Sequence, residues 1–224
     1  VGTSGWSSRM KNLPRTFAFE PFCASVQNQN LKVDGKSRNI LVYAPDNLEK
    51  ERPLIIQMHG MNQDAPYQQN AAKWEGIADT AHFLVVFPNG EGKSWDISGD
   101  KDVNFLKAII NEMYGKYGID KKRVYVSGFS MGGMMSYHAA NKMGDMIAAI
   151  APVSGYPFGA SASSKRMMPI IHTHGTTDDV VGYSGGVDFV KKWVSYEGCS
   201  ATSEKIGSSA IVRGKKYLYN PFHP

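Results

Sequence analysis

The chain has few cysteines, and their arrangement excludes several kinds of site. Only Cys23 and Cys199 occur among its 224 residues. They form no Cys-x-x-Cys pair, and no Cys/His group has the spacing of a zinc site. We therefore expect neither a bound metal nor a cofactor. The sequence leaves open whether the two thiols form a disulfide.

Long apolar runs and concentrated positive charge are also missing. No segment approaches the roughly 20 apolar residues that cross a bilayer, and residues 1–11 lack the apolar core of a signal peptide. The net charge of +5 is scattered, and its densest run, residues 213–216, is short. A nucleic-acid-binding protein would gather such charge on one element. We therefore expect a mature, soluble protein that binds neither membranes nor nucleic acids.

The apolar segments that are present alternate with amphipathic ones. Several are continuous, which is typical of strands buried on both faces of a parallel sheet. The expected strands are Asn39–Ala44, Pro53–His59, Phe83–Phe87, Arg123–Ser127, Ala148–Val153 and Pro169–His174. The expected helices are Tyr67–Thr80, Val103–Tyr117 with Asp102 as its N-cap, Met131–Met143 and Val187–Tyr196. This alternation predicts a doubly wound, mostly parallel α/β sheet with helices on both faces, in a single domain over residues 1–224.

A glycine-rich hexapeptide carries the strongest chemical signal. Gly128-Phe129-Ser130-Met131-Gly132-Gly133 directly follows an expected strand and opens an expected helix. A serine in such a sharp strand-to-helix turn is lifted above the sheet edge, and the two flanking glycines allow the strand and helix backbones to approach closely. This context predicts that Ser130 is a nucleophile that accepts an acyl group.

A serine nucleophile needs a base and an acid that orients the base. The expected strand Pro169–His174 runs into Gly-Thr-Thr-Asp-Asp, so an acid here would share the sheet edge with Ser130. We assign Asp178 as the acid, with Asp179 as the alternative. Chain order Ser, Asp, His then leaves only His223 as the base, although it is the penultimate residue.

Other histidines are expected to be structural. His59 ends a strand and should order its loop by hydrogen bonding. His172 and His174 share one face of a strand at positions i and i+2, as a metal pair would, but no third ligand is apparent nearby. The loop His59-Gly60-Met61-Asn62 fits the second half of an oxyanion hole. The backbone N–H groups of Met61 and Met131 are therefore expected to bind the carbonyl oxygen of the substrate.

With these residues in place, the chain resembles a family of secreted esterases similar to polyhydroxybutyrate depolymerases, which includes the feruloyl and acetylxylan esterases of carbohydrate esterase family 1. The resemblance covers about three quarters of the chain, from Leu31 to Cys199. The pieces that carry it are LKVDGKSRNILVYAP, PLIIQMHGMNQD, VVFPNGEGKSWD, DVNFLKAIINEM, YGIDKKRVYVSGFSMGGMMSYHAA, IAAIAPVSG and IIHTHGTTDDVVGYSGG.

The resemblance implies an α/β-hydrolase fold and a secreted, monomeric serine esterase acting on feruloylated or acetylated xylan. It places Trp95 where related esterases carry an aromatic residue that lines the site, and a packed core tryptophan is the equal alternative. Because Trp95, Tyr156 and Phe158 could stack on an aromatic acid, we expect a feruloyl esterase before an acetylxylan esterase. A polyhydroxyalkanoate depolymerase is a further alternative. Family members usually carry more chain between the Gly198-Cys199 pair and the histidine, so a wall-binding protein with weak catalysis also stays open.

Overall fold

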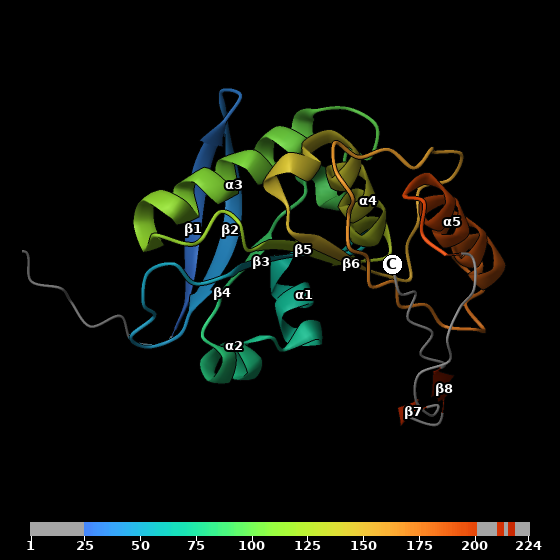
Figure 1. Cartoon of the computed structure of the whole chain (residues 1–224). Coiled ribbons are helices and arrows are strands. Elements are labelled where there is room, and N and C mark those ends of the chain that lie inside the picture. Colours follow the sequence, from blue (N-terminus) through green and yellow to red (C-terminus); the bar gives the residue numbers. More distant parts are fainter. Residues whose placement is uncertain (1–24, 201–209, 213–214, 218–224) are drawn as a thin grey trace, which may run out of the picture.

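The computed structural model describes residues 25–200, 210–212 and 215–217. Its main sheet contains six strands in the order β1-β2-β4-β3-β5-β6 (Figure 1). β1 pairs with β2 and β2 with β4 in antiparallel fashion, whereas β4, β3, β5 and β6 are parallel. The bounds are β1 Ser25–Val33, β2 Lys36–Ala44, β3 Leu54–Met58, β4 Leu84–Pro88, β5 Val124–Phe129 and β6 Ala149–Val153. This is the mostly parallel α/β sheet that the sequence predicts.

Helices cover both faces of this sheet, as expected. Figure 1 shows α3 and α4 on one face, α1 and α2 on the other, and α5 beyond β6. The helices are α1 Ala65–Ala72, α2 Glu75–Ala81, α3 Lys101–Tyr117, α4 Met131–Met143 and α5 Tyr183–Tyr196, with 3-10 turns η1 Glu91–Lys93 and η2 Gly144–Met146. A separate antiparallel pair joins β7 Ala210–Val212 to β8 Lys215–Tyr217.

Each face of the sheet has its own hydrophobic core, and the strands alternate between them. On β2, Ile40 and Val42 belong to the larger core under α3 and α4, whereas Leu41 and Tyr43 belong to the core that includes Ala65 of α1 and Ala78 of α2. Successive side chains of a strand point to opposite faces. A strand buried on both faces must therefore be apolar throughout, which explains the continuous runs in the sequence.

The structure differs from the expected elements in one strand and one helix. The strand β1 was not expected, although Asp34-Gly35, with φ values of 48° and 78°, is a strong signal for a two-residue hairpin turn. The expected helix Tyr67–Thr80 is two helices, because Lys73 takes a left-handed conformation with φ 50° and ends α1. Nothing in the residue type of Lys73 indicates that break.

Two more corrections concern segments close to the site. Expected strand Pro169–His174 forms only two isolated parallel bridges, Ile150 with Ile170 and Val153 with Thr173. Asp102 is not the N-cap of α3: Asp100 holds that position, and Asp102 lies buried in the first turn, paired with Arg38. Gly118 ends α3 in the left-handed conformation, as helix C-termini often require. Among the described residues, no helix is long and apolar enough to span a bilayer.

Candidate functional site at the carboxyl edge of the sheet

Ser130 lies in the turn between β5 and α4 and has an unusual backbone conformation. Its φ is 53° and its ψ is −115°, a combination that residues with a Cβ seldom adopt. Its N–H donates to the Val153 carbonyl at 2.8 Å, and its own carbonyl accepts from the Met134 N–H at 3.0 Å. The two backbone bonds tie the turn to β6 and to the first turn of α4, and so maintain the strained geometry.

Three glycines make this turn sterically feasible. A Cβ on Gly128 would lie 2.4 Å from the Gly132 carbonyl carbon, and one on Gly132 would lie 2.6 Å from the Met58 carbonyl oxygen. A Cβ on Gly155 would lie 2.0 Å from the Ser130 carbonyl oxygen. Backbone therefore packs directly on backbone where β5, α4 and the loops after β3 and β6 meet. The glycines recognised in the hexapeptide serve the role that the sequence predicts.

This close packing gives a direct prediction. Gly132→Ala should destabilise the protein by about 1–3 kcal/mol or more, because the new Cβ would overlap the carbonyl oxygens of Met58 and His59. Gly115→Ala is the matched control, since Gly115 lies in α3 with nothing within 4 Å of an added Cβ. It should stabilise the protein by roughly 0.5–1 kcal/mol. Urea unfolding measures both, and a neutral Gly132→Ala would contradict the tight contact.

The two expected oxyanion donors belong to adjacent loops. Met131 is the first residue of α4, where backbone N–H groups have no partner within the helix. Met61 follows β3, in the loop whose His59 carbonyl lies 2.7 Å from an added Cβ on Gly132. The side chain of Met61 is 60% exposed. The start of α4 therefore packs against the chain that leads into Met61, as a two-loop oxyanion site requires.

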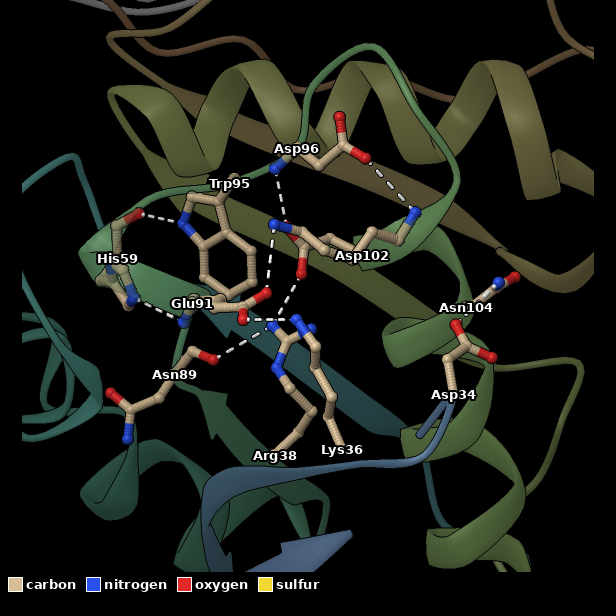
Figure 2. A network of polar contacts seen from close by, with 12 residues as sticks. Asp34, Lys36, Arg38, His59, Asn89, Glu91, Trp95, Asp96, Asp102 and Asn104 are labelled. Carbon is tan, nitrogen blue, oxygen red and sulfur yellow. Dashed lines mark hydrogen bonds and ion pairs between the residues drawn. The ribbon is translucent and has the colours of Figure 1, made fainter. Parts of the chain in front are cut away.

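His59 and Trp95 form the support beneath this loop. His59 is fully buried; its Nδ1 donates to the Gly60 carbonyl at 2.7 Å and its Nε2 accepts from the Gly90 N–H at 2.9 Å. These bonds confirm that His59 orders its loop. Trp95 is only 3% exposed, and its indole N–H donates to the His59 carbonyl at 2.8 Å (Figure 2). Such burial favours the core role for Trp95 over contact with a substrate.

Asp178 lies in the turn that follows the Val153–Thr173 bridge. One carboxylate oxygen, Oδ1, accepts from the N–H groups of Val180 and Val181 at 3.1 and 2.9 Å. The other, Oδ2, is 3.5 Å from Nε2 of the buried His174. Since Val153 also accepts the N–H of Ser130, the loop that carries Asp178 begins at the sheet edge where Ser130 lies.

A chain of hydrogen bonds lies next to Asp178. Tyr137 Oη is 2.9 Å from Nδ1 of His172, whose Nε2 is 3.0 Å from Nδ1 of His174. His174 Nε2 is 2.6 Å from the Val181 carbonyl. Because a carbonyl only accepts, the N–H at Nε2 of His174 is the donor to Val181. From the sequence, the two histidines could have been a pair of metal ligands. In the structure they belong to this series of hydrogen bonds. No group of three metal-binding side chains occurs within the described ranges.

Acid should destabilise this part of the molecule in a distinct pH window. Burial lowers the pKa of His59, and burial followed by the proximity of His174 lowers that of His172 to about 4. The folded pKa thus lies below the unfolded value of about 6.5, so the neutral ring is the stabilised form. This stability is complete above pH ~6.5 and is lost as the pH falls toward 4. For His172 the loss is on the order of 3 kcal/mol.

The free energy of urea unfolding, measured between pH 7.5 and 4, tests this window. Hydrogen bonds lower the pKa values of Asp64, Glu91 and Asp96 from 3.8 or 4.5, so their contributions disappear only at more acid pH. His172→Gln should therefore flatten the slope of stability between pH 6.5 and 4.5. An unchanged slope in that variant would contradict the assignment to His172.

The described histidines have hydrogen-bond partners or positions of their own. Of the described histidines, three have both ring nitrogens engaged in the bonds given above: His59, His172 and His174. His138 uses Nε2 to bond the Gly99 carbonyl at 2.7 Å, and His82 ends α2 on the opposite face of the sheet. Within the described ranges, no hydrogen bond joins a histidine to the Ser130 hydroxyl. His223, the base expected from chain order, lies beyond the described ranges, as does Cys23; Cys199 has no disulfide partner within them.

The mostly parallel sheet with helices on both faces and the serine in a strained strand-to-helix turn define an α/β-hydrolase. The chain belongs to the phospholipase/carboxylesterase family, whose model matches residues 96–207, half of its length.

Two relatives are similar to most of this chain, and one solved structure has a similar fold. The chain is 44% identical over 179 residues to a bifunctional acetylxylan esterase/xylanase of Neocallimastix patriciarum, and 31% identical over 200 residues to feruloyl esterase B of Piromyces equi. These matches cover 79% and 73% of this chain but only 27% and 36% of the relatives. An acetyl xylan esterase from Aspergillus awamori has the same fold, with a TM-score of 0.68, 19% identity, and coverage of 80% of this chain and 84% of that one.

Proposed function

We propose that this chain is a serine esterase that hydrolyses ester groups on plant cell-wall xylan, with Ser130, Asp178 and His223 as its catalytic residues. The observation that carries the proposal is the strained backbone of Ser130 at the start of α4. A protein maintains such a conformation at a cost of roughly 1–3 kcal/mol, which is typical of functional sites. The names of the two relatives above supply the substrate class.

The proposed reaction needs no cofactor. His223 removes the proton of Ser130 while Oγ attacks the ester carbonyl, and the N–H groups of Met61 and Met131 bind the resulting oxyanion. The protonated histidine then donates its proton to the alkoxide of the sugar, which leaves as an alcohol. Water, activated by the same base, attacks the acyl-serine and releases the free acid. Asp178 orients the imidazole and stabilises its charged form.

The preferred acyl group is feruloyl, with acetyl as the second candidate. Phe158 is 65% exposed and meets the Tyr156 ring at 5.1 Å, close to Gly155, which packs on the Ser130 carbonyl. An exposed aromatic face on this loop can stack on an aromatic acid, whereas an acetyl group gains little from it. The acetyl alternative rests on the 44% identity to an acetylxylan esterase.

A side-by-side assay on methyl ferulate, acetylated xylan, short nitrophenyl esters and poly(3-hydroxybutyrate) tests this order. We expect the highest kcat/KM on methyl ferulate. Phe158→Ala should lower it about 2- to 10-fold while sparing nitrophenyl acetate, through loss of stacking worth ~0.5–1.5 kcal/mol. Higher efficiency on acetylated xylan would reverse the order, and efficient release from poly(3-hydroxybutyrate) would favour the depolymerase. No turnover on any ester would favour a wall-binding protein.

The same proposal extends to the state in which the protein acts. It is a secreted, monomeric protein of one domain, because its substrate is part of the plant cell wall and the resemblance is to secreted esterases. Light scattering after size-exclusion chromatography should give a mass near 24.6 kDa. Limited proteolysis should not separate residues 25–200 into two stable fragments. A dimer or two stable fragments would correct these assignments.

A further inference from the structure

The loop after β4 contacts the chain on both sides of Met61. This segment, Asn89–Asp96, is called the brace loop below. Its Gly90 N–H donates to His59 Nε2 at 2.9 Å, and its Trp95 indole donates to the His59 carbonyl at 2.8 Å. After Met61, the Asn62 N–H donates to the Lys93 carbonyl at 2.8 Å. The brace loop thus fixes the residues that bracket the Met61 N–H.

The same loop also contacts the second expected oxyanion donor. The hydroxyl of Ser94 is 3.4 Å from the sulfur of Met131. The ring of Trp95 is 4.8 Å from that of His59, between centroids, so the loop also packs on the chain that leads to Met61. The brace loop therefore contacts both of the loops that carry the expected donors.

A single buried ion pair holds both ends of the brace loop, as Figure 2 shows. Arg38 on β2 donates to Asp102 Oδ1 at 2.6 Å and to the Asn89 carbonyl, where the loop begins, at 3.3 Å. Asp102 on α3 accepts the Asp96 N–H, where the loop ends, at 2.6 Å through Oδ2. The side chains of Arg38 and Asp102 are only 7% and 0% exposed.

The stability of the fold does not account for this pair. Burying two charges costs free energy of desolvation that their attraction often only offsets, and well-packed apolar replacements can be neutral or stabilising. Apolar residues could fill the space, since the Arg38 guanidinium already lies 3.9 Å from the centroid of the Phe105 ring. They could not bond the two ends of the brace loop. The charged pair is therefore explained by the geometry that it gives to the brace loop.

We propose that the Arg38–Asp102 ion pair positions the Met61 N–H as an oxyanion donor, acting through the brace loop and its bonds to His59 and Asn62. Neither residue touches the substrate; both are positioning residues, and Trp95 belongs with them. The inference rests on the proposed esterase function of the same site. Trp95 therefore contributes to the site as a buried residue that positions the loop, without touching the substrate.

The test is the double variant Arg38→Met/Asp102→Leu in the full chain, which removes both charges together and leaves no unpaired buried ion. With nitrophenyl acetate, kcat should fall roughly 10- to 100-fold with KM changed less than about threefold, because complete loss of one oxyanion donor costs ~10²–10³. Phenyl trifluoromethyl ketone, which forms a tetrahedral adduct with a serine, should bind more weakly by the same factor. Titration with a fluorophosphonate counts the folded active sites, so misfolding is separated from the effect on kcat.

Lys36→Met is the matched control. Lys36 lies on the same strand and pairs with Glu91 of the brace loop at 2.8 Å, but its side chain is 64% exposed. It should leave kcat and the affinity for the ketone unchanged. Arg38→Lys keeps the positive charge but loses the planar guanidinium. Its kcat and its affinity for the ketone should lie between those of wild type and the double variant. An unchanged kcat in the double variant, or a loss of kcat without weaker ketone binding, overturns the proposal.

Hydrogen exchange provides a readout that does not depend on catalysis. In wild type the Asn62 N–H is bonded to Lys93, and in the double variant peptides covering residues 59–63 should exchange at least tenfold faster while β5 is unaffected. Unchanged exchange overturns the bracing role whatever the activity. If the wild-type protein cleaves no ester and binds no fluorophosphonate, the proposed function fails, and hydrogen exchange still decides whether the ion pair holds this loop.

Discussion

Ser130→Ala is expected to lower kcat/KM on every ester that the protein cleaves by ~10⁴ or more, because removal of a serine nucleophile leaves only binding and oxyanion stabilisation. The variant should fold normally. Alanine has the same Cβ that the turn already accommodates at φ 53°, and the bonds from Ser130 to Val153 and Met134 are made by backbone atoms. Steady-state kinetics measure the loss of kcat/KM, and a urea unfolding curve measures whether the variant is as stable as wild type.

Ser136→Ala is the control for Ser130. Its hydroxyl donates to the Gly132 carbonyl within α4 at 2.9 Å and should not affect the reaction beyond a few-fold. A fluorophosphonate should label wild type and Ser136→Ala but not Ser130→Ala. Turnover of Ser130→Ala within about tenfold of wild type would remove Ser130 from the mechanism.

Asp178→Asn is expected to lower kcat by ~10³–10⁴, in the range found when the acid of a serine triad is replaced. Asparagine is the informative substitution because its carbonyl oxygen can still accept from the N–H groups of Val180 and Val181, which keeps the turn in place. The main remaining change is the loss of the negative charge that we propose orients His223. The free energy of unfolding should change little.

Asp179→Asn is the matched control one position along the chain. Asp179 is exposed, and its replacement should change kcat less than about threefold. If Asp179→Asn is the more damaging variant, the acid has been assigned to the wrong neighbour. If neither variant affects kcat, the carboxylate of Asp178 serves only the turn and His174, from which Oδ2 is 3.5 Å away.

Much of the fold could be predicted because its strands have a one-dimensional signature. The five strands β2 to β6 were each located within a few residues, since burial on both faces demands a continuous apolar run. β1 carries no such run: its side chains include Gln27, Asn28 and Asn30, and it lies at the edge of the sheet. The segment 169–174 has strand composition but forms only two bridges, which depends on its neighbours rather than its own residues.

Asp102 shows why a polar residue is harder to interpret from sequence. An aspartate before a helical pattern is a frequent N-cap, but its partner Arg38 is 64 positions away. A signal for Arg38 did exist in the alternation of β2, because Arg38 falls on the same face as Ile40 and Val42, which is buried. An arginine on a buried face needs a partner. The sequence could not identify which acid provides it.

The sequence alone determined the alternation of strands and helices and the turn around Ser130. These depend on local periodicity and on glycines within a few residues of the serine. Only the tertiary structure decided that Trp95 is buried, that His172 and His174 form a hydrogen-bonded chain with Tyr137, and that Arg38 and Asp102 hold the loop beneath Met61. Each of those arrangements includes a contact between residues more than 30 positions apart, and the free energy that selects it arises only when the elements pack and exclude water.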